Sequence, residues 1–67
     1  MIALTINGKP RSFESPLTVA QLIEHLDLLG KRIALERNGE IVPRGSFAQQ
    51  PLTDGDRLEI VVAVGGG

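Results

Sequence analysis

Residues 54–64, DGDRLEIVVAV, decide the fold of this chain. The stretch begins as a turn, because Asp-Gly-Asp combines residue types that favour reversals of the backbone. Aliphatic side chains then occupy every second position from Leu58 onward, as in a strand with one buried face. Val61 and Ala63 make the opposite face apolar too, which is typical of a strand in the centre of a sheet. We therefore predict a central strand that leads directly into the three glycines at residues 65–67.

The start of the sequence predicts a hairpin beside which this strand can lie. Residues 2–6 alternate between large apolar and smaller or polar side chains, as a strand with one buried face does. Asn7 and Gly8 both tolerate positive φ and predict a two-residue turn. Residues 9–14 then return as an antiparallel strand. Pro10 places that strand at an edge of the sheet, because proline cannot donate a hydrogen bond to a neighbour.

The clearest helix signal follows this hairpin. Thr18 is a suitable N-cap, and Gln21 three residues later completes a capping box. Gly30 can take the left-handed conformation that ends helices. We expect about three turns, with an apolar stripe formed by Val19, Leu22, Ile23, Leu26 and Leu29.

A second hairpin follows the helix. Ile33 starts a strand, Asn38 and Gly39 give the strongest two-residue turn signal, and residues 40–42 return as a short strand. Residues 44–52 are irregular.

The order strand, strand, helix, strand, short strand, strand predicts an α+β fold. The first hairpin cannot shield its own apolar face, so the helix must cross over it. The last strand belongs beside the first, in the middle of the sheet. This is a ubiquitin-like β-grasp, a mixed sheet of about five strands wrapped around one helix. We predict that the domain spans residues 1–64 and that residues 65–67 form a flexible glycine tail.

Composition excludes several classes of function. The chain has 67 residues, no cysteine, one histidine and a formal net charge of −1. Disulfides, zinc fingers and cysteine nucleophiles are therefore excluded. Two phenylalanines without a basic stripe argue against nucleic-acid binding. We expect no membrane partner, no metal site and a cytoplasmic location, with His25 as a surface residue and Asp54 and Asp56 as turn residues.

The glycine run is the feature that could carry chemistry. At an average glycine usage of about 7%, three glycines in a row at one place arise by chance about 0.03% of the time. Without Cβ atoms, such a segment can thread a channel too narrow for other residues. A terminal carboxylate at Gly67 could enter a partner's active site, be activated there and leave carrying a group.

The sequence resembles the thiamine-biosynthesis sulfur carriers of the ThiS family along its whole length. Residues 62–67, VAVGGG, are similar to the family's ending, and residues 41–44 to its IVPR segment. Residues 6–8, ING, are similar to the family's first turn, and residues 52–61 to its Gly-Asp turn and last strand. The Gly-Gly ending alone is shared with ubiquitin-like modifiers and the small subunit of molybdopterin synthase.

The resemblance implies a cycle in which this chain is a co-substrate and not an enzyme. A ubiquitin-activating-like enzyme would adenylate the Gly67 carboxylate with ATP and magnesium. A sulfur donor such as a cysteine desulfurase would convert it to a thiocarboxylate, which a thiazole synthase would consume. This chain would bind no cofactor itself. Gly66 and Gly67 carry over from the family's motif, and Gly65 is a weaker assignment.

The sheet face opposite the helix is a candidate docking surface. It would show small apolar residues beside the tail, which favours an interface. Arg44, which follows a proline, could pair with an acidic group of a partner or be a solvated loop residue. The predicted docking set is Ala3, Ala34, Val61, Ala63, Arg44 and Gly65.

Three other functions remain open at this level. The chain could serve molybdopterin synthesis, or be a ubiquitin-like modifier that joins Gly67 to a lysine. It could also be a β-grasp binding domain in which the glycines have no role.

Overall fold

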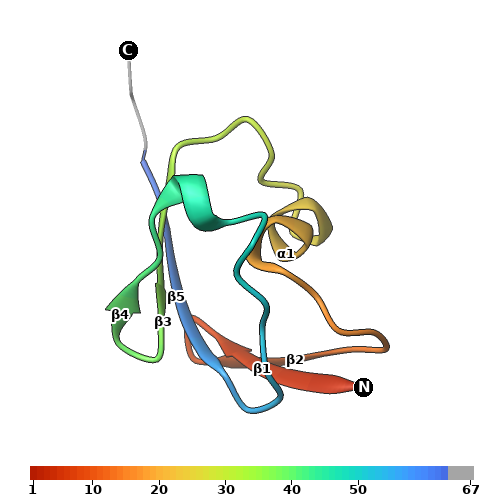
Figure 1. Ribbon diagram of the computed structural model, residues 1–67. Helices are drawn as coiled ribbons and strands as arrows, with labels where there is room; N and C mark the ends of the chain where they lie inside the picture. The colour runs from red at the N-terminus through yellow and green to blue at the C-terminus, as the bar shows by residue number, and fades with distance from the viewer. Residues whose placement is uncertain (64–67) are drawn as a thin grey trace.

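The computed structural model describes residues 1–63 and has the predicted β-grasp architecture (Figure 1). One five-stranded mixed sheet, in the order β2-β1-β5-β3-β4, packs against one helix. The predicted boundary between a domain at 1–64 and a tail at 65–67 lies outside the described residues. The elements are β1 (Ile2–Ile6), β2 (Lys9–Phe13), α1 (Val19–His25), β3 (Ile33–Arg37), β4 (Glu40–Ile41), the 3₁₀ helix η1 (Arg44–Ser46) and β5 (Arg57–Val62).

The last strand is central, as predicted. β5 runs parallel to β1 and antiparallel to β3, with Thr5 opposite Arg57 and Ala34 opposite Val61. β2 pairs with β1 alone and lies at an edge, which leaves Pro10 without a neighbour on its open side. The position of β5 between both hairpins sets the direction in which the chain leaves the sheet.

Two asparagines fasten the central strand to both hairpins. Asn7 takes positive φ in the first turn, and its side chain accepts from the Ile60 N–H at 2.7 Å and donates to the Ile60 carbonyl at 3.0 Å. Asn38 takes positive φ in the second turn, and its side-chain oxygen accepts the Arg57 N–H at 2.9 Å. Both turn signals in the sequence therefore also determine contacts far along the chain.

The helix begins as predicted. Thr18 Oγ1 accepts the Gln21 N–H at 3.2 Å, and Gln21 Oε1 accepts the Thr18 N–H at 2.9 Å, which completes the capping box. Leu17 and Leu22 are both buried, at the positions of a hydrophobic staple.

The helix ends earlier than predicted, after seven residues instead of about three turns. Asp27 takes the left-handed conformation (φ 60°), and the Leu28 N–H donates to the Ile23 carbonyl at 3.0 Å. This pattern is a Schellman motif, which closes a helix. The prediction that Gly30 caps the helix is wrong, because Gly30 takes its positive φ in the next turn. Leu29 is consequently 65% exposed and not part of the stripe.

The core lies between α1 and one face of the sheet (Figure 1). The inward side chains of β1, β3 and β5 meet the helix, and the long loop before β5 adds Leu52. Burial of this apolar surface is the main stabilising contribution available to the domain. The buried set is Ile2, Leu4, Ile6, Leu17, Val19, Leu22, Ile23, Leu35, Val42, Leu52, Leu58 and Ile60.

Candidate functional site

The end of β5 is where the chain leaves the sheet. Beyond the last strand residue, the Ala63 N–H still donates to the Arg32 carbonyl at 2.9 Å, so pairing with the β3 side continues to the last described residue. Gly65, Gly66 and Gly67, the residues predicted to carry the chemistry, lie outside the described residues. Their assigned role stays a prediction.

The predicted outer face of the sheet is open. Ala3, Ala34 and Ala63 are exposed, and Val61 is 65% exposed on the side of the sheet opposite α1. Ala34 lies directly across from Val61 on the neighbouring strand. The exposure that the strand alternation predicts is thus confirmed for these four residues, while their docking role stays a prediction.

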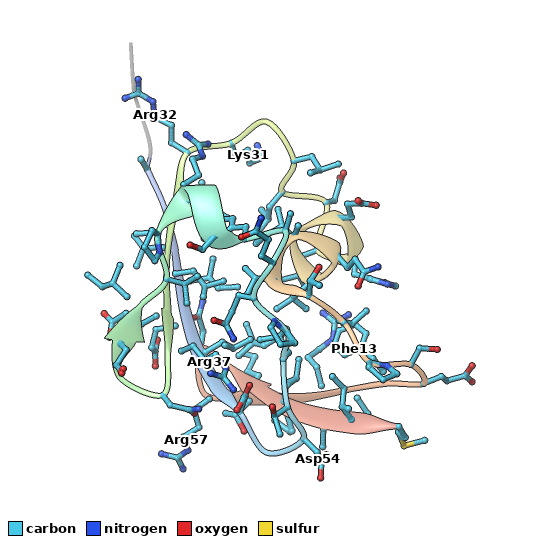
Figure 2. All side chains as sticks on the ribbon, viewed as in Figure 1. Phe13, Lys31, Arg32, Arg37, Asp54 and Arg57 are labelled. Carbon is cyan, nitrogen blue, oxygen red and sulfur yellow. The ribbon has the colours of Figure 1, made fainter. Side chains whose placement is uncertain are left out.

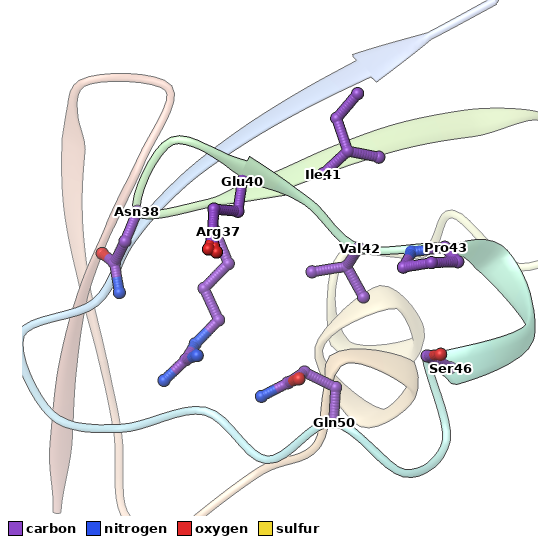
Figure 3. A pocket seen from close by; sticks show the side chains of 8 residues that line it. All are labelled: Arg37, Asn38, Glu40, Ile41, Val42, Pro43, Ser46 and Gln50. Atoms are coloured by element: carbon purple, nitrogen blue, oxygen red, sulfur yellow. The ribbon is translucent and has the colours of Figure 1, made fainter.

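Sequence analysis missed one large residue of this face. Ile41 is 74% exposed and lies opposite Glu36 on the neighbouring strand β3. Glu36 and the buried Leu35 face opposite sides of the sheet, so Ile41 lies on the outer face. Figure 3 shows Ile41 and Val42 directed to opposite sides of β4, with Val42 toward the helix. The alternation around buried Val42 could have predicted this, because successive strand residues face opposite sides.

Two glutamates oppose each other beside the apolar part of this face. Glu36 on β3 is the direct partner of Glu59 on β5, and both are exposed. Like charges directly opposite each other destabilise a sheet. The outer face therefore has a local negative charge next to Val61 and Ile41.

Arg44 is exposed as predicted, and it has a partner within the chain. Its Nη2 atom donates to the Lys31 carbonyl at 3.0 Å and links η1 to the loop before β3. His25 is also on the surface as predicted, where its ring meets the Phe13 ring edge-on at 5.3 Å between centroids.

Asp56 belongs to a buried network that sequence analysis did not find. Its carboxylate pairs with Arg37 Nε at 2.7 Å and accepts from Asn38 at 3.0 Å and from the Thr53 N–H at 2.8 Å. Burial by itself raises the pKa of Asp56, but the hydrogen bonds from Thr53, Arg37 and Asn38 outweigh it and hold that pKa below its ordinary value. The network fixes the turn at which β5 begins.

The described surface offers shallow hollows. The one beside the second hairpin, of about 310 Å³, is shown in Figure 3. Its lining combines Arg37 and Asn38, which serve the Asp56 network, with Gln50 and the start of η1. Within residues 1–63, no three His, Cys, Asp or Glu side chains are grouped so as to hold a metal ion. The same residues contain no helix long and apolar enough to span a membrane.

Comparison with known proteins identifies relatives along nearly the whole chain. The model of the ThiS family matches residues 4–67. The sulfur carrier protein ThiS of Bacillus subtilis is 35% identical over 65 residues, which cover 96% of this chain and 98% of that protein. A thiazole synthase of Paramagnetospirillum magneticum is 48% identical over 64 residues, which cover 96% of this chain. The chain spans only 20% of that synthase.

Solved structures show the same fold. The crystal structure of the thiamine biosynthesis protein ThiS from Geobacter metallireducens has a TM-score of 0.83 and is 33% identical. The similarity covers 98% of this chain and all of that one. The fold of the described residues is therefore that of a solved ThiS protein.

Proposed function

The chain belongs to the ThiS family of thiamine-biosynthesis sulfur carriers, and we propose that it carries sulfur on the carboxyl group of Gly67. A carboxylate is a poor electrophile, so a partner first joins it to AMP, using ATP and magnesium and releasing pyrophosphate. The outer sulfur of a persulfide donor, such as that of a cysteine desulfurase, then displaces AMP and forms an acyl disulfide. A thiol reductant cleaves the S–S bond, forms a disulfide with the donor sulfur and leaves a thiocarboxylate on Gly67. A thiazole synthase takes this sulfur for the thiazole of thiamine.

The observation that carries this proposal is the match of the ThiS family model to residues 4–67. The fold supports it, because the strand that leads to these last residues, β5, lies in the centre of the sheet. Asn7 and Asn38 hold β5 from both sides, and Arg32 pairs with Ala63 at its end. The four residues after Ala63 can span at most about 13–14 Å. We call these four residues, 64–67, the tether. The domain fixes where the tether starts, and the catalytic groups belong to the enzymes that bind it.

The outer face of the sheet is proposed as the surface that docks on those enzymes. Val61 and Ala34 provide apolar area toward the tether, and Glu36 and Glu59 border it on the side away from the tether. Ile41 adds apolar area beyond Glu36. An apolar centre with a polar border is the usual composition of a transient interface. The cytoplasmic location predicted from the sequence stays a prediction.

Intact mass spectrometry tests the carrier function. The full chain is incubated with the adenylating enzyme, the persulfide-bearing sulfur donor, ATP, magnesium and a thiol reductant. We expect its mass to increase by the difference between one sulfur and one oxygen atom, because one carboxylate oxygen is exchanged. A chain lacking Gly66 and Gly67 is the matched control, because it keeps every described residue and should show no exchange.

The same measurement separates the other functions. A ladder of heavier conjugates would indicate a modifier, and an unchanged mass with every component present would contradict the carrier function. Transfer of the sulfur to a molybdopterin synthase but not to a thiazole synthase would reassign the pathway.

A further inference from the structure

Three cations gather at the end of the molecule toward which β5 runs. Lys31 and Arg32 lie in the loop before β3, Arg44 lies in η1, and all three are exposed. Figure 2 shows Lys31 and Arg32 at this end. We call the three residues the tail-base patch.

Two hydrogen bonds tie the tail-base patch to the start of the tether. Arg44 Nη2 donates to the Lys31 carbonyl at 3.0 Å, which brings its guanidinium group to the loop of Lys31 and Arg32. The Arg32 carbonyl accepts the Ala63 N–H at 2.9 Å. The two bonds therefore hold the Arg44 guanidinium group and the backbone of Lys31 and Arg32 close to the end of β5.

The patch is a local excess of positive charge on a chain with a formal net charge of −1. Residues 28–35 and 41–53 contain no aspartate or glutamate, so Lys31, Arg32 and Arg44 are their only charged side chains. Arg37, by contrast, is paired with Asp56 at 2.7 Å. Among residues 1–63, none of Lys31, Arg32 and Arg44 takes part in an ion pair, so their charges are available to a partner.

The length of the tether decides what the patch meets. Any enzyme that binds Gly67 must bring the rim of its entrance to within about 13–14 Å of Ala63, because four residues cannot reach further. The patch lies beside that starting point, on the side of β3, so it faces the rim and not the depth of the active site. A rim that attracts it must carry carboxylates.

We infer that the tail-base patch docks on an acidic surface around the entrance through which a thiazole synthase receives the tether, which rests on the proposed function. We choose this partner because of one relative, the thiazole synthase of Paramagnetospirillum magneticum. A segment 48% identical to this chain forms part of that synthase. Charges at the border of an interface act chiefly by steering association, and salt weakens this effect.

Association kinetics with the thiazole synthase of the source organism test this inference. The association rate constant is measured for the full chain at about 25 and 500 mM salt, which span strong and weak screening. We expect Arg32→Glu to lower it roughly 3- to 10-fold at low salt and less than about twofold at high salt, as for a steering charge.

Arg57→Glu is the matched control. It makes the same change in charge on an exposed arginine at the opposite end of β5, and we expect it to change the rate less than about twofold. Should Arg32→Glu fail to fold, Arg32→Gln removes the charge alone, and Lys31→Glu tests a second member of the patch.

Equal effects at Arg32 and Arg57, or wild-type association that salt does not change, would overturn the inference. Arg32-dependent binding to a DNA duplex without binding to the synthase would also overturn it. If wild-type chain gains sulfur but the patch variants associate normally, the patch fails and the carrier function stands. If wild-type chain gains no sulfur, the carrier function fails and the patch loses its partner.

Discussion

The carboxylate of Asp56 stabilises the turn from which the central strand β5 starts. It receives hydrogen bonds from Thr53, Arg37 and Asn38 while being only 5% exposed. An asparagine keeps one of the two oxygen acceptors, so the donors that face the replaced oxygen lose their partner and the others lose the negative charge. We expect Asp56→Asn to lower the free energy of unfolding by about 1.5–3 kcal/mol at neutral pH, measured by urea denaturation.

The difference between wild type and this variant should depend on pH. The folded-state pKa of Asp56 is lowered, so its contribution is complete above the unfolded-state pKa, about 3.9 for aspartate. It is lost as the pH falls through the folded-state value. The two proteins should therefore start to converge as the pH falls below about 4 and become alike only below the folded-state pKa of Asp56. Asp54→Asn, in the same turn but exposed, is the control, and a comparable loss there would contradict the special role of Asp56.

At the scale of elements, the pairing of β3 with β5 places two negative side chains directly opposite each other, and their repulsion lowers the stability of the sheet. Glu36 and Glu59 are direct partners on the exposed face. Opposite charges in such a position stabilise a sheet by a few tenths to about 1 kcal/mol, and like charges destabilise it by similar amounts. We expect Glu36→Lys to raise the free energy of unfolding by about 0.5–1 kcal/mol at low salt.

Salt provides the check on this prediction. The gain should shrink in about 1 M salt, because exposed charges are then screened. Glu14→Lys is the control for net charge, since Glu14 is exposed just beyond the end of β2 and has no cross-strand partner. A gain at Glu14 as large as that at Glu36 would show that overall charge, not the cross-strand pair, determines the effect.

The sequence predicted those elements whose signals are local. Alternation gave the strands, Asn-Gly pairs gave both turns, and the Thr18–Gln21 capping box gave the start of the helix. The predicted end of the helix was wrong, because Asp27 takes the left-handed conformation that Gly30 was expected to take. Glycine is favoured there, but aspartate tolerates the conformation, so the sequence alone did not decide between them.

Contacts between distant residues were not predictable in the same way. The Arg37–Asp56 pair joins residues 19 apart, and the tail-base patch forms only because Arg44 reaches the Lys31 carbonyl. The exposed alanines and Val61 of the outer face were predictable from alternation, whereas Ile41 was missed on a strand of two residues. Predicting long-range contacts requires the three-dimensional arrangement of the chain. Predicting which residues of a regular strand share a face requires only the two-residue period of the strand.

For the whole molecule, the fold places the core on one face of the sheet and leaves the other face exposed. The inner face holds the core, so it cannot change without loss of stability. Changes on the outer face should affect stability much less, because its side chains, such as Val61 at 65%, are exposed and lie outside the core. If the outer face is the docking surface, a substitution there should weaken partner binding without unfolding the domain.

Val61→Asn makes this separation measurable. We expect the free energy of unfolding to change by less than about 1 kcal/mol, as for surface positions in strands. Affinity for the adenylating enzyme, measured by titration calorimetry, should fall by about 10-fold or more, because a buried valine contributes about 1.5–3 kcal/mol. Leu29→Asn is the matched control, since Leu29 is equally exposed at 65% but lies in the loop beyond the helix. Unchanged affinity for the Val61 variant, or an equal loss for the Leu29 variant, would show that the enzyme does not dock on the outer face.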